Sequence, residues 1–218
     1  MDQLKNLLNR SSSEEIAALA KILDASPATV SGIVDAFLWN CQSKLTYIFG
    51  NEPSYKKIVQ QVAKELKVRY QEYESVREIE IRIAQKVMET LWEKMTPEQR
   101  KEMEVQLRST AAEFDKTGAL LESASIFGAL TAAQLSGFGI YLLASTTLGA
   151  ITGAIGITLP FVVYTTMSSA IAVVIGPVGW IGAGLFAVWK LTGPNYKKLI
   201  PAILYVCALR ARLDGGFA

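Results

Sequence analysis

The amino-acid sequence predicts an all-α protein with an N-terminal bundle of amphipathic helices, a C-terminal charge-free, glycine-rich hydrophobic helical hairpin and a basic C-terminal helix. Apolar residues in the first 122 positions recur at the spacing of one helix face. No segment shows the strict alternation that is typical of a half-buried strand. No Asp, Glu, Lys or Arg occurs from Ser123 to Trp189. These observations divide the chain into residues 1–122, 123–189 and 190–218.

The first two predicted helices begin at residues that favour helix N-termini. Ser12 and Glu15 have the spacing of a capping box, and apolar residues follow at helical intervals as far as Leu23. Ser26 followed by Pro27 has the pattern of an N-cap and a first helical position. We therefore expect one helix from about residue 12 and a second from about residue 26.

Three further helices complete the predicted N-terminal bundle. Ser54 precedes a segment with apolar residues on one side and lysines on the other. A longer apolar stripe runs from about Glu74 to Met95. Thr96 and Pro97 then predict the start of a helix that extends to about residue 115. Each of these helices has an apolar face that needs a partner.

The charge-free segment of 67 residues contrasts with the rest of the chain, which carries all 22 basic and 20 acidic residues. A helix surface in water needs a polar stripe, so this segment is expected to lie against lipid or protein. Ile126 to Ser145 is about as long as one membrane span. Small residues, prolines and tryptophans predict where the hairpin turns and packs: Gly149, Gly153, Gly156, Pro160, Gly176, Pro177, Gly179, Trp180 and Trp189.

The C-terminal segment is basic and predicts the orientation of the hairpin. Its cations, expected as a membrane flank, are Lys190, Lys197, Lys198, Arg210 and Arg212, against Asp214 alone. Basic flanks favour the cytoplasmic side of a membrane. The N-terminal region has no signal-peptide core, so both termini are expected on the cytoplasmic face of the inner membrane. Two crossings fit both ends and the length of the charge-free segment.

The inventory of reactive side chains favours a protein that is not an enzyme. The chain has no histidine, which excludes histidine-dependent nucleophilic sites and the common histidine metal motifs. Cys41 and Cys207 are far apart in apolar segments and predict buried, reduced thiols. No glycine-rich segment completes a phosphate-binding motif. We expect no catalytic residue, no metal and no cofactor, and the net charge of +2 argues against nucleic acid as a partner.

Three segments of the chain have a recognisable pattern: residues 4–23, residues 55–68 (YKKIVQQVAKELKV) with their continuation at 91–103 (LWEKMTPEQRKEM), and residues 195–213 (NYKKLIPAILYVCALRARL). They resemble the YaaW-like family of uncharacterised bacterial proteins. The family is sometimes grouped with ubiquinol-cytochrome c chaperone-like proteins, which implies an assembly role at a respiratory membrane. The resemblance is weakest between Ser123 and Lys190, and it implies no catalytic residues.

Two functions are compatible with the sequence. In the first, the chain associates with or inserts into a lipid bilayer through the apolar hairpin, as a membrane-anchored or membrane-permeabilising factor, and small residues favour a homo-oligomer. In the second, a soluble helical interaction protein or assembly chaperone buries the hairpin in its own core and binds a protein client. Location at the membrane is expected for the first function, and a cytoplasmic protein for the second.

Overall fold

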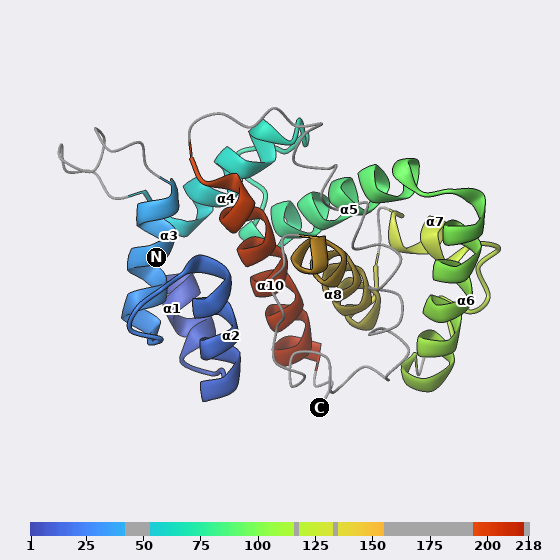
Figure 1. Cartoon of the computed structure of the whole chain (residues 1–218), viewed down its shortest axis with the longest axis horizontal. Coiled ribbons are helices and arrows are strands. Elements are labelled where there is room, and N and C mark those ends of the chain that lie inside the picture. The colour runs from blue at the N-terminus through green and yellow to red at the C-terminus, as the bar shows by residue number, and fades with distance from the viewer. Residues whose placement is uncertain (42–52, 116–117, 133–134, 155–193, 216–218) are drawn as a thin grey trace.

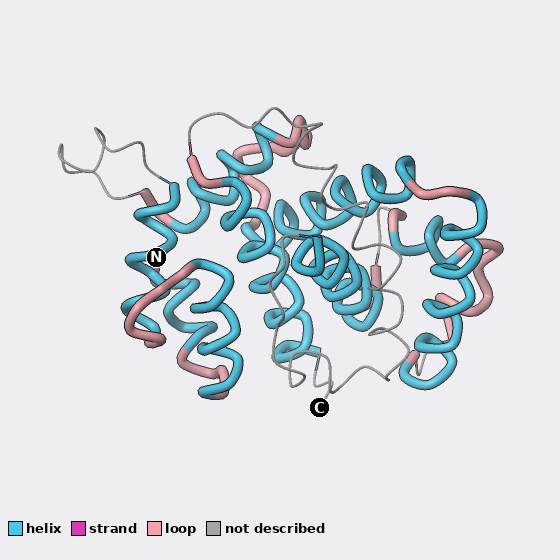
Figure 2. Tube along the Cα trace, in the orientation of Figure 1, coloured by secondary structure: helices cyan, strands magenta, loops and turns pink. Residues whose placement is uncertain are grey.

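The computed structural model describes residues 1–41, 53–115, 118–132, 135–154 and 194–215 of the 218-residue chain. These residues form nine helices and no strand, so the predicted all-α class is confirmed (Figures 1 and 2). The helices are α1 (Asp2–Leu8), α2 (Ser13–Leu23), α3 (Val30–Cys41), α4 (Tyr55–Glu65), α5 (Val76–Lys94), α6 (Pro97–Phe114), α7 (Ile126–Leu130), α8 (Gly137–Ala154) and α10 (Tyr196–Gly215).

Local capping determines where four of the N-terminal helices begin. Ser12, Ser75 and Thr96 each form a complete capping box with the Glu or Gln three residues later, at the starts of α2, α5 and α6. The hydroxyl of Ser54 accepts from the Lys57 N–H at the start of α4. The predicted starts near residues 12, 54, 74 and 96 are therefore confirmed.

The predicted start of a helix at Ser26 and Pro27 is wrong, because α3 begins at Val30. Thr29 provides the cap: its Oγ1 accepts from the Gly32 N–H at 3.2 Å, and its carbonyl accepts from the Ile33 N–H at 2.9 Å. Gly32 is needed at this point because a Cβ there would lie 2.1 Å from the Pro27 carbonyl oxygen. The loop before α3 thus packs closely on the first turn of the helix.

The C-terminal helix α10 is confirmed as a helix, and it lies at the centre of the molecule. It passes between α1–α3 on one side and α5 and α8 on the other (Figure 1), with contacts to α2, α3, α4, α5 and α8. Every residue from Leu199 to Leu209 is buried. Its basic residues lie near its two ends, so α10 combines an apolar middle with charged termini.

The predicted single span from Ile126 to Ser145 is wrong, because two helices share this stretch. The short α7 ends at Leu130 and α8 begins at Gly137. Ser136 caps α8, since its Oγ accepts from the Gly139 N–H at 3.0 Å and its carbonyl accepts from the Ile140 N–H at 3.0 Å. A serine that was expected inside an apolar span is therefore a helix boundary.

Helix α8 lies in the interior of the fold and packs chiefly on α10 and also on α5. Every residue from Phe138 to Thr152 is buried, which is the expected surrounding for a helix that is apolar on all sides. Three of its buried hydroxyls are satisfied locally, since Ser145, Thr147 and Thr152 each donate to a backbone carbonyl four residues earlier. The buried Thr146 hydroxyl has no hydrogen-bond partner among the described residues. Within the part of the chain that the structure describes, no helix combines the length and apolarity needed to cross a membrane.

Candidate functional site

A buried polar cluster joins α4, α5 and α10 at the centre of the fold. The Glu80 carboxylate on α5 accepts from Arg210 Nε at 3.0 Å and from Arg210 Nη2 at 3.1 Å. The Tyr55 hydroxyl on α4 donates to the same carboxylate at 2.9 Å. Glu80 has no solvent exposure, whereas the Arg210 side chain is 15% exposed. We call Tyr55, Glu80 and Arg210 the buried triad.

Burial and the charges of neighbouring groups together shift the pKa values of the triad. Burial raises the pKa of Glu80, and the neighbouring Arg210 guanidinium opposes this effect. The pKa of Tyr55 is raised well above its usual value, first by burial and then by the Glu80 charge. The pKa of Arg210 is raised although its own burial acts in the opposite direction, because Glu80 lies beside it. Glu80 is more deeply buried than Arg210 and therefore loses more hydration on folding.

Glu80 was not predicted as a functional residue, although its position in the sequence contains a signal. Val76, Ile79 and Ile83 form the apolar stripe of α5, and Glu80 lies on the same side, four residues after Val76 and three before Ile83. A carboxylate within an apolar stripe predicts a buried partner of opposite charge. The identity of that partner could not be predicted, since Arg210 is 130 positions away.

Most of the predicted basic membrane flank binds carboxylates of this chain. Arg210 contacts Glu80, Arg212 contacts Glu15 on α2, and Lys198 forms a 2.5 Å ion pair with Asp24. Lys197 is exposed, and Lys190 lies outside the described residues. The acidic Asp214 pairs with Arg10 at 3.1 Å and lies 4.0 Å from Arg77. Ion pairs thus fix both ends of α10 to the N-terminal helices.

The predicted hairpin-packing residues are only partly described. Gly149 is buried in α8, and Gly153 is exposed near the end of that helix. The others, Gly156, Pro160, Gly176, Pro177, Gly179, Trp180 and Trp189, lie outside the described residues. Their predicted role therefore remains a prediction.

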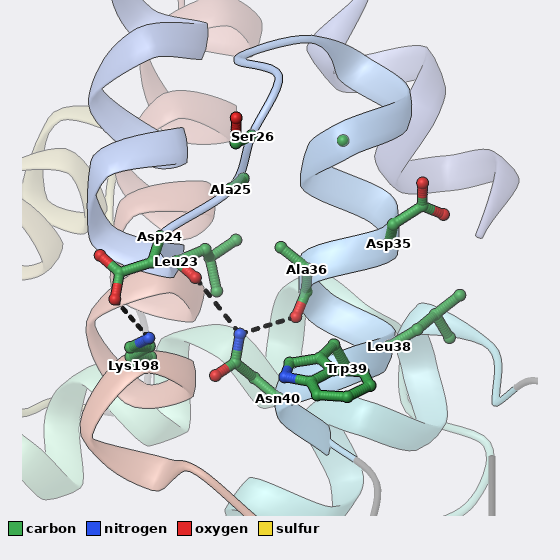
Figure 3. Close-up of a pocket in the computed structure, with 11 residues that line it drawn as sticks. Leu23, Asp24, Ala25, Ser26, Asp35, Ala36, Leu38, Trp39, Asn40 and Lys198 are labelled. Atoms are coloured by element: carbon green, nitrogen blue, oxygen red, sulfur yellow. Dashed lines mark hydrogen bonds and ion pairs between the residues drawn. The ribbon is translucent and has the colours of Figure 1, made fainter.

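A pocket of about 420 Å³ opens between the end of α2, α3 and the start of α10 (Figure 3). The Asn40 side chain lies at its floor and donates to the carbonyls of Leu23 (3.3 Å) and Ala36 (2.8 Å). The Asp24–Lys198 ion pair lies on one side and Trp39, which is 62% exposed, on the other. The pocket is therefore bordered by a salt bridge and an exposed indole ring.

Polar side chains of α6 hold the start of the charge-free region. The Glu104 carboxylate accepts from the N–H groups of Ile126 (3.0 Å) and Phe127 (3.1 Å) and from the Ser125 hydroxyl. Arg108 donates to the backbone carbonyls at 121, 123 and 124. A negative charge at the N-terminus of α7 is favourable, because the unpaired N–H groups point toward it.

The chemistry of these groups favours a structural role. Cys41 and Cys207 are buried free thiols, as predicted. Burial raises the pKa of Cys41 to about 11 and that of Cys207 well above its usual value, so both thiols are protonated and unreactive at neutral pH. Among the residues in the described ranges, no group of three His, Cys, Asp or Glu side chains could hold a metal ion. The triad connects three helices and offers no activated nucleophile.

Comparisons with known proteins give two relatives. A UPF0174 protein of Helicobacter pylori strain J99 is 30% identical over 175 residues, which cover 80% of this chain and 67% of the relative. A UPF0174 protein of Helicobacter pylori strain 26695 is 29% identical over 161 residues, which cover 73% of this chain and 76% of the relative. No family model matches the sequence, and no solved structure matches it.

Proposed function

The chain belongs to the UPF0174 protein family, and we propose that it is a non-enzymatic, membrane-associated protein whose helical bundle carries residues 155–189 to a lipid bilayer. The observation that supports this proposal is the charge distribution. The described half of the charge-free region is accounted for by α7 and by α8, which is buried in the fold. Residues 155–189 still contain no Asp, Glu, Lys or Arg.

The hydrophobic effect supports contact between this segment and lipid. Removing about 20 apolar helical residues from water buries on the order of 2,000 Å², which at about 25 cal/mol per Å² is favourable by tens of kcal/mol. Surface ion pairs contribute about 1 kcal/mol or less each. The free energy gained when a segment of this composition enters an apolar environment is therefore far larger than the contribution of any exposed ion pair of the bundle.

The arrangement of α8 and α10 supports different roles for the helical bundle and for residues 155–189. Residues 155–193 begin where α8 ends and finish where α10 begins, and these two helices pack on each other in the interior. The ion pairs of Lys198, Arg210 and Arg212 attach α10 to the N-terminal helices. In the proposal, the bundle is a rigid base on the cytoplasmic face of the inner membrane, and glycines in the apolar segment favour association with further copies.

A matched pair of valine substitutions tests the proposal. Val163 lies in the apolar segment, whereas Val105 on α6 is 60% exposed. An arginine near the middle of a bilayer costs about 2.5–3.5 kcal/mol, so Val163→Arg is expected to lower membrane retention by roughly a hundredfold. Unmodified protein and Val105→Arg are expected to remain in carbonate-washed membranes. Complete release of the unmodified protein by carbonate contradicts the proposal.

The burial of α8 favours a second candidate function, that of a soluble interaction protein or assembly chaperone. A helix that is apolar all round and fully buried from Phe138 to Thr152 is typical of a protein core. Under this alternative, the YaaW-like resemblance implies a chaperone role and residues 155–189 pack on protein. The purified chain would then be monodisperse without detergent, and Val163→Arg would lower the free energy of unfolding.

A further inference from the structure

Helix α4 carries a set of exposed lysines on the side opposite its buried face. Its buried side chains are Tyr55, Ile58, Val59, Val62 and Ala63. Lys57 and Lys64 are exposed and lie seven residues apart, which places them two turns apart on one side of the helix. Lys67 follows the helix and is also exposed. From residue 56 to residue 69 the chain has five basic residues and one acidic residue, Glu65.

These lysines belong to the exposed cations of the fold that form no ion pair among the described residues. None of the ion pairs among the described residues includes Lys57, Lys64 or Lys67. The same holds for the exposed Lys197 near the start of α10. In contrast, Lys198, Arg210 and Arg212 each bind a carboxylate of this chain. We call Lys57, Lys64, Lys67 and Lys197 the basic face.

The basic face lies at the end of the bundle where the chain returns from residues 155–193. The start of α10 lies beside α4 (Figure 1). The Asn195 N–H donates to the Asn40 carbonyl at 2.8 Å, which joins the start of α10 to the end of α3. Burial raises the pKa of Tyr196, whose hydroxyl also interacts with Gln61 and Glu65 on α4. The start of α10, the end of α3 and the last turn of α4 therefore meet at Asn195 and Tyr196, directly before Lys197 in the sequence.

An exposed tryptophan adds an apolar element to the same end of the bundle. Trp39 precedes Asn40 in the last turn of α3, and its side chain is 62% exposed. An indole ring combines an apolar body with a polar N–H, and such rings favour the boundary between water and lipid. Exposed lysines and an exposed tryptophan at one end of a bundle are typical of surfaces that bind at a membrane interface.

We infer that the basic face docks on the anionic headgroups of a lipid bilayer, next to the start of α10, where the chain returns from residues 155–193. The inference rests on the proposed function, because residues 155–189 and the basic face meet the same membrane. Unpaired lysines near an anionic surface attract its lipids. A nucleic acid is a weaker candidate, since the net charge of the chain is only +2. Docking through the basic face orients the bundle so that residues 155–189 reach the bilayer.

Co-sedimentation of the full chain with vesicles tests the inference. One set of vesicles contains phosphatidylcholine alone, and the other contains equal parts of phosphatidylcholine and phosphatidylglycerol. Each lysine near an anionic surface changes the affinity by about fivefold, so Lys57→Gln combined with Lys64→Gln is expected to weaken binding to the anionic vesicles by roughly 25-fold. High salt is expected to weaken the binding of the unmodified protein in the same way.

A matched variant controls for the loss of charge. Lys94→Gln combined with Lys101→Gln removes two exposed lysines from α5 and α6, which lie away from the basic face, and gives the same net charge. This variant is expected to bind the anionic vesicles as the unmodified protein does. An equal loss of binding in both double variants overturns the inference, and so does equal binding of the unmodified protein to both kinds of vesicle. Circular dichroism checks that all variants are folded.

Two further outcomes separate the inference from the proposed function. Tighter binding to duplex DNA than to the anionic vesicles overturns the inference and leaves the carbonate test of Val163→Arg unaffected. Failure of the proposed function has another signature: carbonate releases the unmodified protein completely, while the basic face still gives salt-sensitive adsorption to anionic vesicles.

Discussion

Arg210 on α10 donates two hydrogen bonds to the carboxylate of Glu80 on α5, and this contact joins residues 130 positions apart in the interior of the bundle. Removing one partner of a buried ion pair leaves the other charge uncompensated and costs about 3–5 kcal/mol. Glu80→Ala and Arg210→Ala are therefore each expected to lower the free energy of unfolding by about that amount. Urea denaturation measures the change.

Arg10→Ala is the control, because it removes the exposed ion pair between Arg10 and Asp214. This pair is expected to contribute about 1 kcal/mol or less to the free energy of unfolding. The combination of Glu80→Leu with Arg210→Leu removes both charges and is expected to be more stable than either single alanine variant. Losses in Glu80→Ala and Arg210→Ala that simply add in the double alanine variant contradict a direct interaction between the two charges.

The titration of Glu80 predicts a pH dependence of stability. Burial raises the pKa of Glu80 above its ordinary value of 4.5. At a pH between the ordinary pKa of 4.5 in the unfolded chain and the raised pKa in the folded protein, Glu80 is protonated when folded and ionised when unfolded. The contribution of Glu80 to the free energy of unfolding is therefore fully present below pH 4.5. It decreases as pH rises through the folded pKa. The difference between the unmodified protein and Glu80→Gln should follow this course in urea denaturation, and a difference that grows with pH contradicts it.

The contact of Glu104 with α7 predicts a local effect. The carboxylate accepts from two backbone N–H groups of α7, and hydrogen bonds to charged groups contribute about 1.5–3 kcal/mol each. Glu104→Ala is expected to speed hydrogen exchange in residues 126–130. Glu102→Ala, on the exposed side of the same helix, should leave this exchange unchanged. Equal exchange in both variants means that Glu104 does not hold α7.

The cap of α3 can be tested against the cap that the sequence pattern favoured. Thr29 binds the Gly32 N–H, whereas Ser26 lies in the loop before it. Loss of an N-cap hydroxyl costs about 1 kcal/mol. Thr29→Ala is expected to lower the melting temperature, and Ser26→Ala to have a smaller effect. A larger loss in Ser26→Ala contradicts the position of the cap.

Local signals in the sequence predicted the class of the fold and most helix starts. The capping pairs that begin with Ser12 and Thr96 are contained within four residues, so they can be recognised without knowledge of the tertiary structure. The same rule failed at Ser26, because the close approach of Pro27 to Gly32 leaves the cap to Thr29. The helix start at Ser136 was not predicted, since a hydroxyl in an apolar segment can cap a helix or bind the preceding turn.

The candidate site was less predictable because its contacts are distant in sequence. The position of Glu80 in an apolar stripe indicates a buried carboxylate, but no local pattern identifies Arg210 as its partner. Arg210, Arg212 and Lys198 have the composition of a membrane flank, and only the folded chain shows that each binds a carboxylate. Lys57 and Lys64 were recognised as a polar helix side, but their place beside the start of α10 depends on the tertiary structure.

The proposed function requires residues 155–189 to contact the hydrocarbon of a bilayer while the bundle stays outside it. The two native cysteines are buried, so an environment-sensitive fluorophore can be placed selectively at Val163→Cys or at Val105→Cys. Vesicles that contain phosphatidylglycerol and lipids with a quencher on the acyl chain are then added. The account predicts strong quenching of the probe at position 163 and little quenching at position 105. Equal, weak quenching at both positions would contradict it.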